Sequence, residues 1–483
     1  MMSLLDEKWV HYVDSLIFNF SDMNIRNLLL VLVTVVLWMG CGEKTTEQGE
    51  PPVFVNSVPV DGAEDVAVST TVVVTFDEIV KLASNHNITI NGNVADVTAL
   101  LTQLTINVEL QESTEYVVKI PVGAVVNTAG VANDKEVIFK YKTVSPVVNN
   151  IKSDLAVANA SPQAVKLYNY LKDNYGTKII SSTMANVNWN INEAEWVKQH
   201  TGKYPAMATF DYVHLPASPA NWIDYSNTTI VEDWWANNGL ISANWHWIVP
   251  KKQGDTDPNN FTYKPEETTF SATNALVDGT WENTILKADL EKLAGYLLLL
   301  KNKNIPVMWR PFHEAAGNIY EYSNGTAWFW WGAKGADTYK KLWIYMFNYF
   351  EAQGLNNLIW VWTTQTKDNA FYPGDQYVDI IGRDIYNKSV ASTIAAEFTS
   401  IQEAYPTKIV TLSECGNVAN ISSQWTAGAT WSFFMPWYDY DRTLSTTSTA
   451  FASTSHGHAN AAWWIDAFAQ DYVITRDEMP SLK

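Results

Sequence analysis

Positive charge is scarce in this sequence of 483 residues. Lysine and arginine together number 32 against 51 aspartates and glutamates, which leaves a formal net charge of −19. Because nucleic acids are bound through clustered positive charge, this balance argues against a nucleic-acid partner. It is compatible with a neutral ligand.

Signals for a metal or a cofactor are also missing. No stretch has the spacing of a metal site, of a phosphate-binding loop or of a dinucleotide-binding fingerprint, so we expect neither a metal nor a cofactor. The nearest approach to a ligand pair is His456 and His458, in a Ser/Thr-rich stretch that we interpret as a loop. Cysteine is almost absent, since Cys41 and Cys415 are the only two.

The apolar run 28–39 near the N-terminus indicates targeting. It is shorter than the roughly 20 residues that a transmembrane helix needs. It follows a short basic start and ends at Gly40-Cys41, which resembles a bacterial lipoprotein signal. The resemblance implies a lipid anchor at Cys41 as the one membrane attachment, and a place in the cell envelope or on the outer surface of a bacterium. The alternative is a poorly cleaved anchor helix. With Cys41 lipidated, no intramolecular disulfide is available.

Residue composition and hydrophobic pattern divide the chain into four segments. Residues 1–41 form the N-terminal extension and signal, and 42–52 a polar linker. Residues 53–145 contain short β-branched runs separated by turn residues, which predicts a small β-sandwich. Its stretch "SVPVDGAEDVAVSTTVVVTFDEIV" resembles bacterial immunoglobulin-like domains. We find no cluster of catalytic or ligand-binding residues in this domain. A spacer is therefore its simplest role, and carbohydrate binding is the alternative.

Residues 146–483 alternate strand-like and helix-like patterns, which predicts an α/β fold with parallel strands. Helical patterns lie between several of the strand-like runs, for example at 282–303 and 335–353. The eight runs fit a (β/α)₈ TIM barrel, whose active site lies at the C-terminal ends of the strands. The runs are 177–184, 204–212, 239–250, 305–314, 356–365, 377–386, 407–416 and 428–439.

Two of these runs carry a glutamate at their C-terminal end: Glu314 is the last residue of the fourth run, and Glu414 lies two residues before the end of the seventh. A lone glutamate at a strand end is usually a solvated loop residue. Two carboxylates on one barrel rim could instead flank a glycosidic bond, one as acid and then base, the other as nucleophile. A retaining enzyme needs them roughly 5–5.5 Å apart.

Four motifs in order carry a family resemblance: "RPFHE" (310–314), "WFWWG" (328–332), "YPGDQYVDIIGRDIY" (372–386) and "LSECG" (412–416). With them, residues from about 150 to 483 resemble glycoside hydrolase family 26. The resemblance implies a (β/α)₈ barrel and a retaining endo-β-1,4-mannanase that acts on mannan, galactomannan or glucomannan. We expect a monomer.

The resemblance also assigns roles to residues. Glu314 matches the general acid/base and Glu414 the nucleophile. His313 matches the histidine before the acid/base, and Tyr386 the tyrosine that hydrogen-bonds the nucleophile. His246 matches a histidine that contacts the sugar beside the cleaved bond. A satisfied structural histidine remains the alternative for His313.

Elementary chemistry adds conditions to these roles. Glu314 must start protonated, so its surroundings should raise its pKa. Glu414 must be ionised, so donors such as Tyr386 and Arg310 should hold it charged. Arg310 is expected to support the site from behind, and Asp384 is a further strand-end carboxylate, either support or structural.

The loop after Glu314 departs from the family pattern. The stretch "AAGNIYEYSNGTA" separates Glu314 from the aromatic motif, so Trp328 carries over only weakly as a substrate-binding residue. Two alternatives to a mannanase stay open. One is the same mechanism on mixed-linkage β-glucan or β-1,3-xylan, and the other a non-catalytic glycan-binding surface lipoprotein.

Overall fold

The computed structural model describes residues 49–483, except 69, 145–149, 186 and 441–444. The described residues form two compact units, one before residue 147 and one from there onward. Cys41 and the signal lie outside the described residues. Within the described ranges, none of the helices is both long and apolar enough to cross a lipid bilayer.

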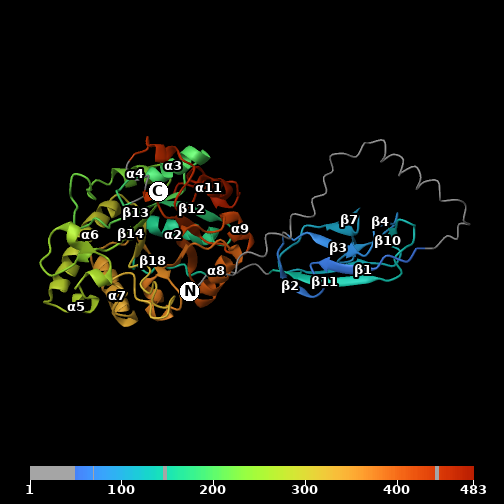
Figure 1. Ribbon diagram of the computed structural model, residues 1–483, viewed down its shortest axis with the longest axis horizontal. Helices are drawn as coiled ribbons and strands as arrows, with labels where there is room; N and C mark the ends of the chain where they lie inside the picture. The colour runs from blue at the N-terminus through green and yellow to red at the C-terminus, as the bar shows by residue number, and fades with distance from the viewer. Residues whose placement is uncertain (1–48, 69, 145–149, 186, 441–444) are drawn as a thin grey trace, which may run out of the picture. The chain divides into compact units, whose positions relative to one another are not determined.

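The first unit is an all-β sandwich (Figure 1). One sheet has the order β1-β3-β8-β7, the other β2-β11-β9-β5-β6, and β4 pairs with β10. The strands are β1 (Phe54–Val58), β2 (Ala63–Val66), β3 (Val72–Phe76), β4 (Val80–Leu82), β5 (Thr89–Ile90), β6 (Asn93–Val94), β7 (Asp96–Leu100), β8 (Gln103–Asn107), β9 (Glu115–Ile120), β10 (Val125–Asn127) and β11 (Val137–Thr143).

Alternating side chains explain why this segment folds as a sandwich. In β9, Tyr116, Val118 and Ile120 are buried, whereas the residues between them are exposed. Successive side chains of a strand point to opposite faces, so each sheet has one apolar face to cover. These faces build a core that includes Val74 and Leu104 of the other sheet.

The second unit is a closed barrel of eight parallel strands. Closure occurs because the first barrel strand pairs with both its sequence neighbour β13 and the last strand β21. The barrel strands are β12 (Ile179–Met184), β13 (Met207–Asp211), β14 (Leu240–Trp245), β17 (Val307–Pro311), β18 (Leu358–Thr364), β19 (Ile380–Tyr386), β20 (Ile409–Gly416) and β21 (Phe433–Pro436).

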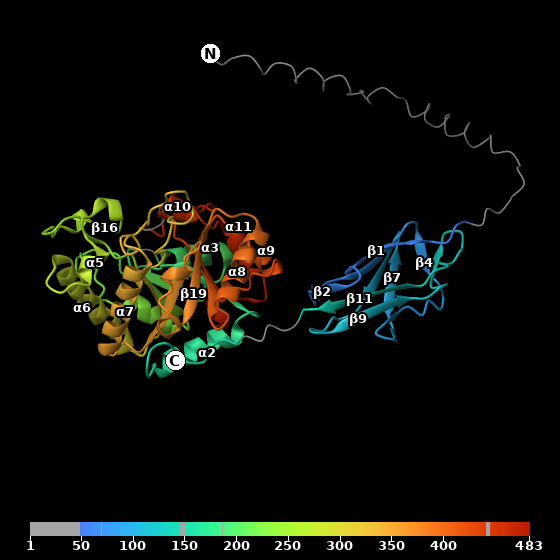
Figure 2. The same ribbon diagram turned by 90° about the horizontal axis from the view of Figure 1, so that it is seen from below.

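The helices surround the barrel strands (Figures 1 and 2). They are α2 (Pro162–Asn174), α3 (Asn192–Thr201), α4 (Thr229–Ala236), α5 (Ala272–Ala275), α6 (Trp281–Lys301), α7 (Ala336–Ala352), α8 (Ala391–Ala404), α9 (Ile421–Thr426), α10 (Thr449–Ala452) and α11 (Ala461–Phe468). Three short strands complete the unit: β15 (Val249–Pro250) pairs with β16 (Phe261–Thr262), and β22 (Val473–Ile474) joins β12.

The sequence pattern of α6 shows how one of these helices is specified. Thr280 caps its N-terminus, because its side chain accepts a hydrogen bond from the backbone N–H of Asn283. Leu286, Leu290 and Leu293, spaced three or four residues apart, are buried against the barrel. The helix therefore buries one apolar stripe and leads the chain back to the start of β17.

The fold class predicted from the sequence is confirmed, and the differences lie at strand ends. Run 305–314 overshoots β17, which ends at Pro311, and run 239–250 overshoots β14, which ends at Trp245. Both runs continue beyond the last ladder hydrogen bond because most of the residues that follow these strands, polar ones included, are buried too. The polar residues after β14 and β17 therefore lie on loops at the carboxyl rim of the barrel.

Candidate active site

Strand register brings the polar residues of the barrel together. Asp211, Asn244 and Arg310 are successive register partners across β13, β14 and β17. On the other side of the barrel, Asp384 of β19 pairs with Glu414 of β20, just after a register shift. These residues are all buried, so the barrel holds several charges that must compensate one another.

Arg310 is the centre of this compensation. Its Nη1 donates to Asp384 Oδ2 at 3.0 Å, and its Nη2 contacts Glu414 Oε1. Its Nε donates to Asn244 Oδ1 and its Nη1 also donates to Thr363 Oγ1, both at 3.1 Å. Ser413 donates to the other oxygen of Asp384 at 2.6 Å. Arg310 thus supports Glu414 from inside the barrel, and Asp384 holds the other side of the guanidinium.

Glu414 has a second donor in Tyr386. The tyrosine hydroxyl donates to Glu414 Oε2 at 2.9 Å. Burial and the nearby carboxylates raise the pKa of Tyr386 well above its ordinary value, so the hydroxyl keeps its proton. Burial raises the pKa of Glu414 to about 7, and the Arg310 guanidinium and the Tyr386 hydroxyl oppose that rise. Both oxygens of Glu414 therefore have donors that favour its ionised form.

Glu314 lies in a different environment. It follows β17 in a left-handed conformation with φ of 49°, which costs about 1 kcal/mol or more for a residue with a side chain. Burial raises its pKa well above the ordinary value, and the carboxylates of Asp384 and Glu414 raise it further. The hydrogen bond that it accepts comes from a neutral group, Gln365 Nε2, at 3.1 Å. Glu314 is therefore the carboxyl group of the pair that keeps a proton.

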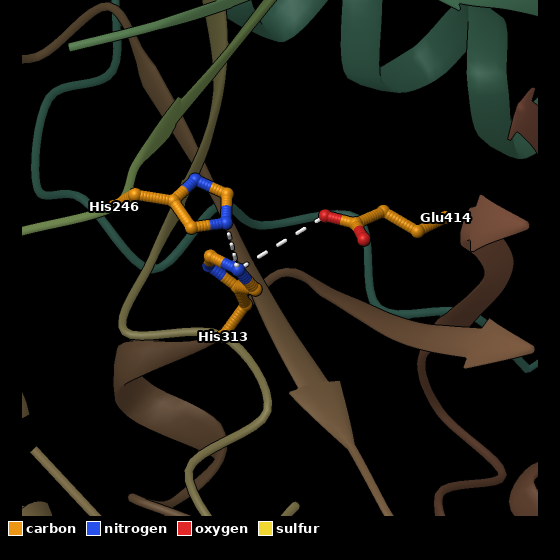
Figure 3. A group of neighbouring side chains, drawn as sticks. All are labelled: His246, His313 and Glu414. Carbon is orange, nitrogen blue, oxygen red and sulfur yellow. Dashed lines mark hydrogen bonds and ion pairs between the residues drawn. The ribbon is translucent and has the colours of Figure 1, made fainter. Parts of the chain in front are cut away.

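His246 and His313 form a pair beside Glu414 (Figure 3). Their Nε2 atoms lie 3.0 Å apart, and His313 Nε2 is 4.0 Å from Glu414 Oε1. His246 Nδ1 contacts Asp211 Oδ2 at 2.5 Å. Burial lowers the pKa of His313 well below its ordinary value, whereas Asp211 outweighs burial and raises the pKa of His246. The deeply buried His313 therefore stays neutral and links the two sides of the site.

The same three side chains could be considered as metal ligands. One ligand atom each from His246, His313 and Glu414 lies within 4.8 Å of the others. However, Glu414 Oε1 already contacts the Arg310 guanidinium, and His246 Nδ1 contacts Asp211. A fixed positive charge on one ligand disfavours a cation there, so the arrangement fits a hydrogen-bond network better than a metal site.

A cavity of about 700 Å³ opens over these residues. Both carboxyl groups and both histidines line it, together with Tyr386 and aromatic side chains. Trp328 borders it with 44% of its surface exposed, which leaves room for a ring to stack on it. The further aromatic residues of the lining are Tyr263, Phe329, Trp437 and Tyr440.

Most tryptophans have a structural role instead. Trp245 and Trp247, which flank His246 in the sequence, are buried and stack with ring centroids 4.1 Å apart. Trp309, Trp360 and Trp362 are fully buried in the barrel unit. His456 is also structural, because its buried Nε2 lies 2.8 Å from Glu193 Oε2 and fixes its loop to α3.

The structure thus brings Glu314, Glu414, His246, His313 and Tyr386 to one cavity, with Trp328 on its border. Arg310 and Asp384 lie behind it, in the barrel. Sequence reasoning missed Asp211 and Gln365. Gln365 ends the run 356–365 and Asp211 is the penultimate residue of the run 204–212, and this position at a strand end is the signal that could have found them.

A closed parallel barrel with paired carboxyl groups at the ends of its fourth and seventh strands defines the class of barrel glycoside hydrolases. Comparison with known proteins gives the family. Residues 156–466 match glycosyl hydrolase family 26, and the chain belongs to that family. Residues 48–143 match the bacterial Ig-like domain.

Individual relatives extend the comparison. The chain is 32% identical over 347 residues to mannan endo-1,4-beta-mannosidase B of a Piromyces species, covering 69% of this chain and 55% of that one. The chain therefore spans about half the length of this curated relative.

Solved structures agree with this family. The GH26 domain of an endo-beta-mannanase/endo-beta-glucanase from Prevotella bryantii is 40% identical with a TM-score of 0.62, covering 68% of this chain and 99% of that one. A beta-mannanase from a symbiotic protist of the termite Reticulitermes speratus, solved with a gluco-manno-oligosaccharide, is 33% identical with a TM-score of 0.57. That match covers 69% of this chain and 99% of the protist structure.

Proposed function

We propose that this protein is a retaining endo-β-1,4-mannanase that cleaves internal bonds of mannan, galactomannan or glucomannan. The observation that carries the proposal is the division of roles between two carboxyl groups on one cavity. Glu414 is bound by Arg310 and Tyr386, which favour its ionised form, whereas the pKa of Glu314 is raised well above its ordinary value. The mannosidase relatives support β-mannan as the substrate.

Each step of the reaction can be assigned to these groups. Glu414 attacks the anomeric carbon while Glu314 protonates the departing glycosidic oxygen, and a glycosyl-enzyme ester forms. Glu314, now ionised, then removes a proton from a water molecule that hydrolyses the ester. His246 lies on the cavity beside Glu414, where it can hydrogen-bond a sugar hydroxyl.

The substrate is tested with purified protein on galactomannan, glucomannan, barley glucan and β-1,3-xylan. We expect short manno-oligosaccharides from the first two, with the β-anomer formed first as followed by NMR. Preferred release from barley glucan or β-1,3-xylan would assign the same mechanism to another β-glycan. If no products are released from any of the polymers, the proposal of an enzyme is refuted and a glycan-binding protein is favoured.

Replacement of either glutamate tests the two roles. Glu314→Ala and Glu414→Ala should each lower kcat on mannan by a factor of about 10³ or more, because each removes a group that the chemistry requires. Added azide should restore turnover of an activated aryl substrate in both variants, with a β-azide product for Glu314→Ala and an α-azide product for Glu414→Ala. Near-normal activity in either variant would refute its assignment.

We further propose that Cys41 is lipidated and that the protein is a monomer on the outer cell surface. The apolar run that ends at Gly40-Cys41 supports the anchor. Metabolic labelling with a fatty acid should mark the full-length protein, and Cys41→Ser should remove the label and release the protein from membranes. Light scattering of the purified protein tests the monomer.

A further inference from the structure

Gln365 connects the acid/base to a second polar network. It follows β18, and its Nε2 donates to Glu314 Oε1 at 3.1 Å. Its own Oε1 accepts a hydrogen bond from Arg383 Nη1 at 3.0 Å. An arginine can only donate, so this contact turns the amide oxygen toward Arg383 and leaves the amide nitrogen facing Glu314.

Arg383 is itself held by groups that do not line the catalytic cavity. Its Nε and Nη2 donate to Glu397 Oε2 on α8 at 2.9 and 2.8 Å, and its Nη1 also donates to the Thr364 carbonyl at 3.2 Å. Lys388 contacts the second oxygen of Glu397. This network borders a separate cavity of about 370 Å³ whose lining includes Gln365 and Arg383 but neither catalytic glutamate.

We propose that Gln365 and Arg383 are positioning residues that orient the Glu314 carboxyl group for proton transfer. The inference rests on the proposed function. Gln365 donates to Oε1, so in the acid form Oε1 is the accepting carbonyl oxygen and the proton resides on Oε2. Arg383 prevents the amide from reversing, and Glu397 fixes Arg383. Neither residue lines the substrate cavity.

This arrangement has two measurable consequences. Without the Gln365 donor, the Glu314 carboxyl group can rotate. Part of the rate enhancement from general-acid catalysis, a factor of about 10²–10⁴, is then lost. In addition, the positive charge of Arg383 opposes the rise in the pKa of Glu314, so its removal raises that pKa further. Glu314 must be protonated for the first step, and the basic limb of the pH profile should then move to higher pH.

The test uses the full chain with Gln365→Met and Arg383→Met, which keep apolar bulk but remove the donors. Two substrates are compared: a manno-oligosaccharide, whose leaving group needs a proton, and an aryl β-manno-oligoside with a dinitrophenolate leaving group, which does not. We expect kcat/KM for the oligosaccharide to fall about 10- to 100-fold in both variants, and bond cleavage of the aryl substrate to change less than about threefold.

Ser400→Ala is the matched control, because Ser400 lines the same outer cavity, and it should keep wild-type rates on both substrates. An equal loss on both substrates in Gln365→Met and Arg383→Met would mean general structural support and overturn the proposal. Unchanged rates on the oligosaccharide would also overturn it.

A readout without catalysis separates this proposal from the proposed function. In ¹³C-labelled protein, the Glu314 carboxyl resonance, assigned with Glu314→Gln, reports its pKa by titration. Arg383→Met should move that titration to higher pH, and the absence of a shift would overturn the positioning role. Wild-type protein that cleaves none of the glycans would refute the proposed function alone, because the titration still tests the network.

Discussion

Glu414 depends on a small number of donors, and each makes a different contribution. Arg310 supplies a full positive charge from inside the barrel, whereas Tyr386 supplies a neutral hydroxyl from its rim. The two contacts therefore predict different defects. Loss of the hydroxyl should change the ionisation of Glu414, and loss of the guanidinium should also leave two buried carboxylates without compensation.

Tyr386→Phe tests the neutral donor. The hydroxyl lowers the pKa of Glu414, so its removal should raise that pKa. Glu414 must be ionised to attack, and the acid limb of kcat/KM against pH should therefore move to higher pH. Tyr372→Phe is the control, because that hydroxyl binds Asp375 outside the cavity lining. An unchanged acid limb in Tyr386→Phe would contradict the assignment.

Arg310→Met tests the charged donor by its effect on stability. Arg310 and its partners Asp384 and Glu414 have nearly inaccessible side chains, so loss of the arginine should lower the free energy of unfolding by about 3 kcal/mol or more. Urea denaturation followed by tryptophan fluorescence measures this. Asp384→Asn in the Arg310→Met background should restore part of the loss. Further destabilisation would argue against the proposed charge compensation.

At the scale of elements, the loop from Ala315 to Ala327 separates Glu314 from the aromatic motif that begins at Trp328. Asn318, Thr326 and Ala327 of this loop line the catalytic cavity. Its conformation depends on Gly325, because a Cβ added there would lie 1.8 Å from the Asn318 carbonyl oxygen. At Gly325 two stretches of the loop backbone therefore pass so close together that alanine cannot fit unless the loop moves.

Gly325→Ala should displace this loop and raise KM for mannan several-fold, with kcat on a short activated substrate nearly unchanged. Gly295→Ala is a matched control in α6, where an added Cβ has open space. Alanine is the better helix former, so this control should keep wild-type kinetics and gain about 0.5–1 kcal/mol of stability. Equal KM values for Gly325→Ala and wild type would exclude a role of the loop in binding.

On the scale of the whole molecule, the two units have separate apolar cores. Ile151 packs against the barrel core, and the Lys152 backbone N–H donates to the Thr407 carbonyl. The barrel unit therefore includes residues from 151 onward. A chain that begins at residue 150 should therefore fold and keep kcat/KM on soluble manno-oligosaccharides within about twofold. A large loss on those substrates would mean that the sandwich contributes to the site.

The same truncation tests the role of the sandwich on polymers. If the sandwich is a spacer, its removal should not change the activity of the purified enzyme on insoluble mannan. A carbohydrate-binding domain should lower activity on insoluble mannan when removed and leave the soluble substrates unaffected. Binding of an isolated sandwich to mannan, measured by pull-down, would distinguish the two roles directly.

The sequence by itself determined the order of elements and placed polar residues at or just after the ends of β17 and β20. This is so because strand periodicity, turn residues and the position of polar groups after apolar runs are local properties. It also located Glu314 and Glu414, since each lies at or near the C-terminal end of a strand-like run and parallel strands place such ends at one rim.

Only the tertiary structure decided which groups contact these two residues. The contacts of Arg310 with Glu414 and of His246 with Asp211 join residues from different strands, and they depend on strand register and barrel closure. The hydrogen-bonded series Glu314–Gln365–Arg383–Glu397 likewise joins the loops after β17 and β18 to the middle of β19 and to α8. Burial of the charges sets their pKa values, and burial is a property of the packed barrel rather than of any local stretch of sequence.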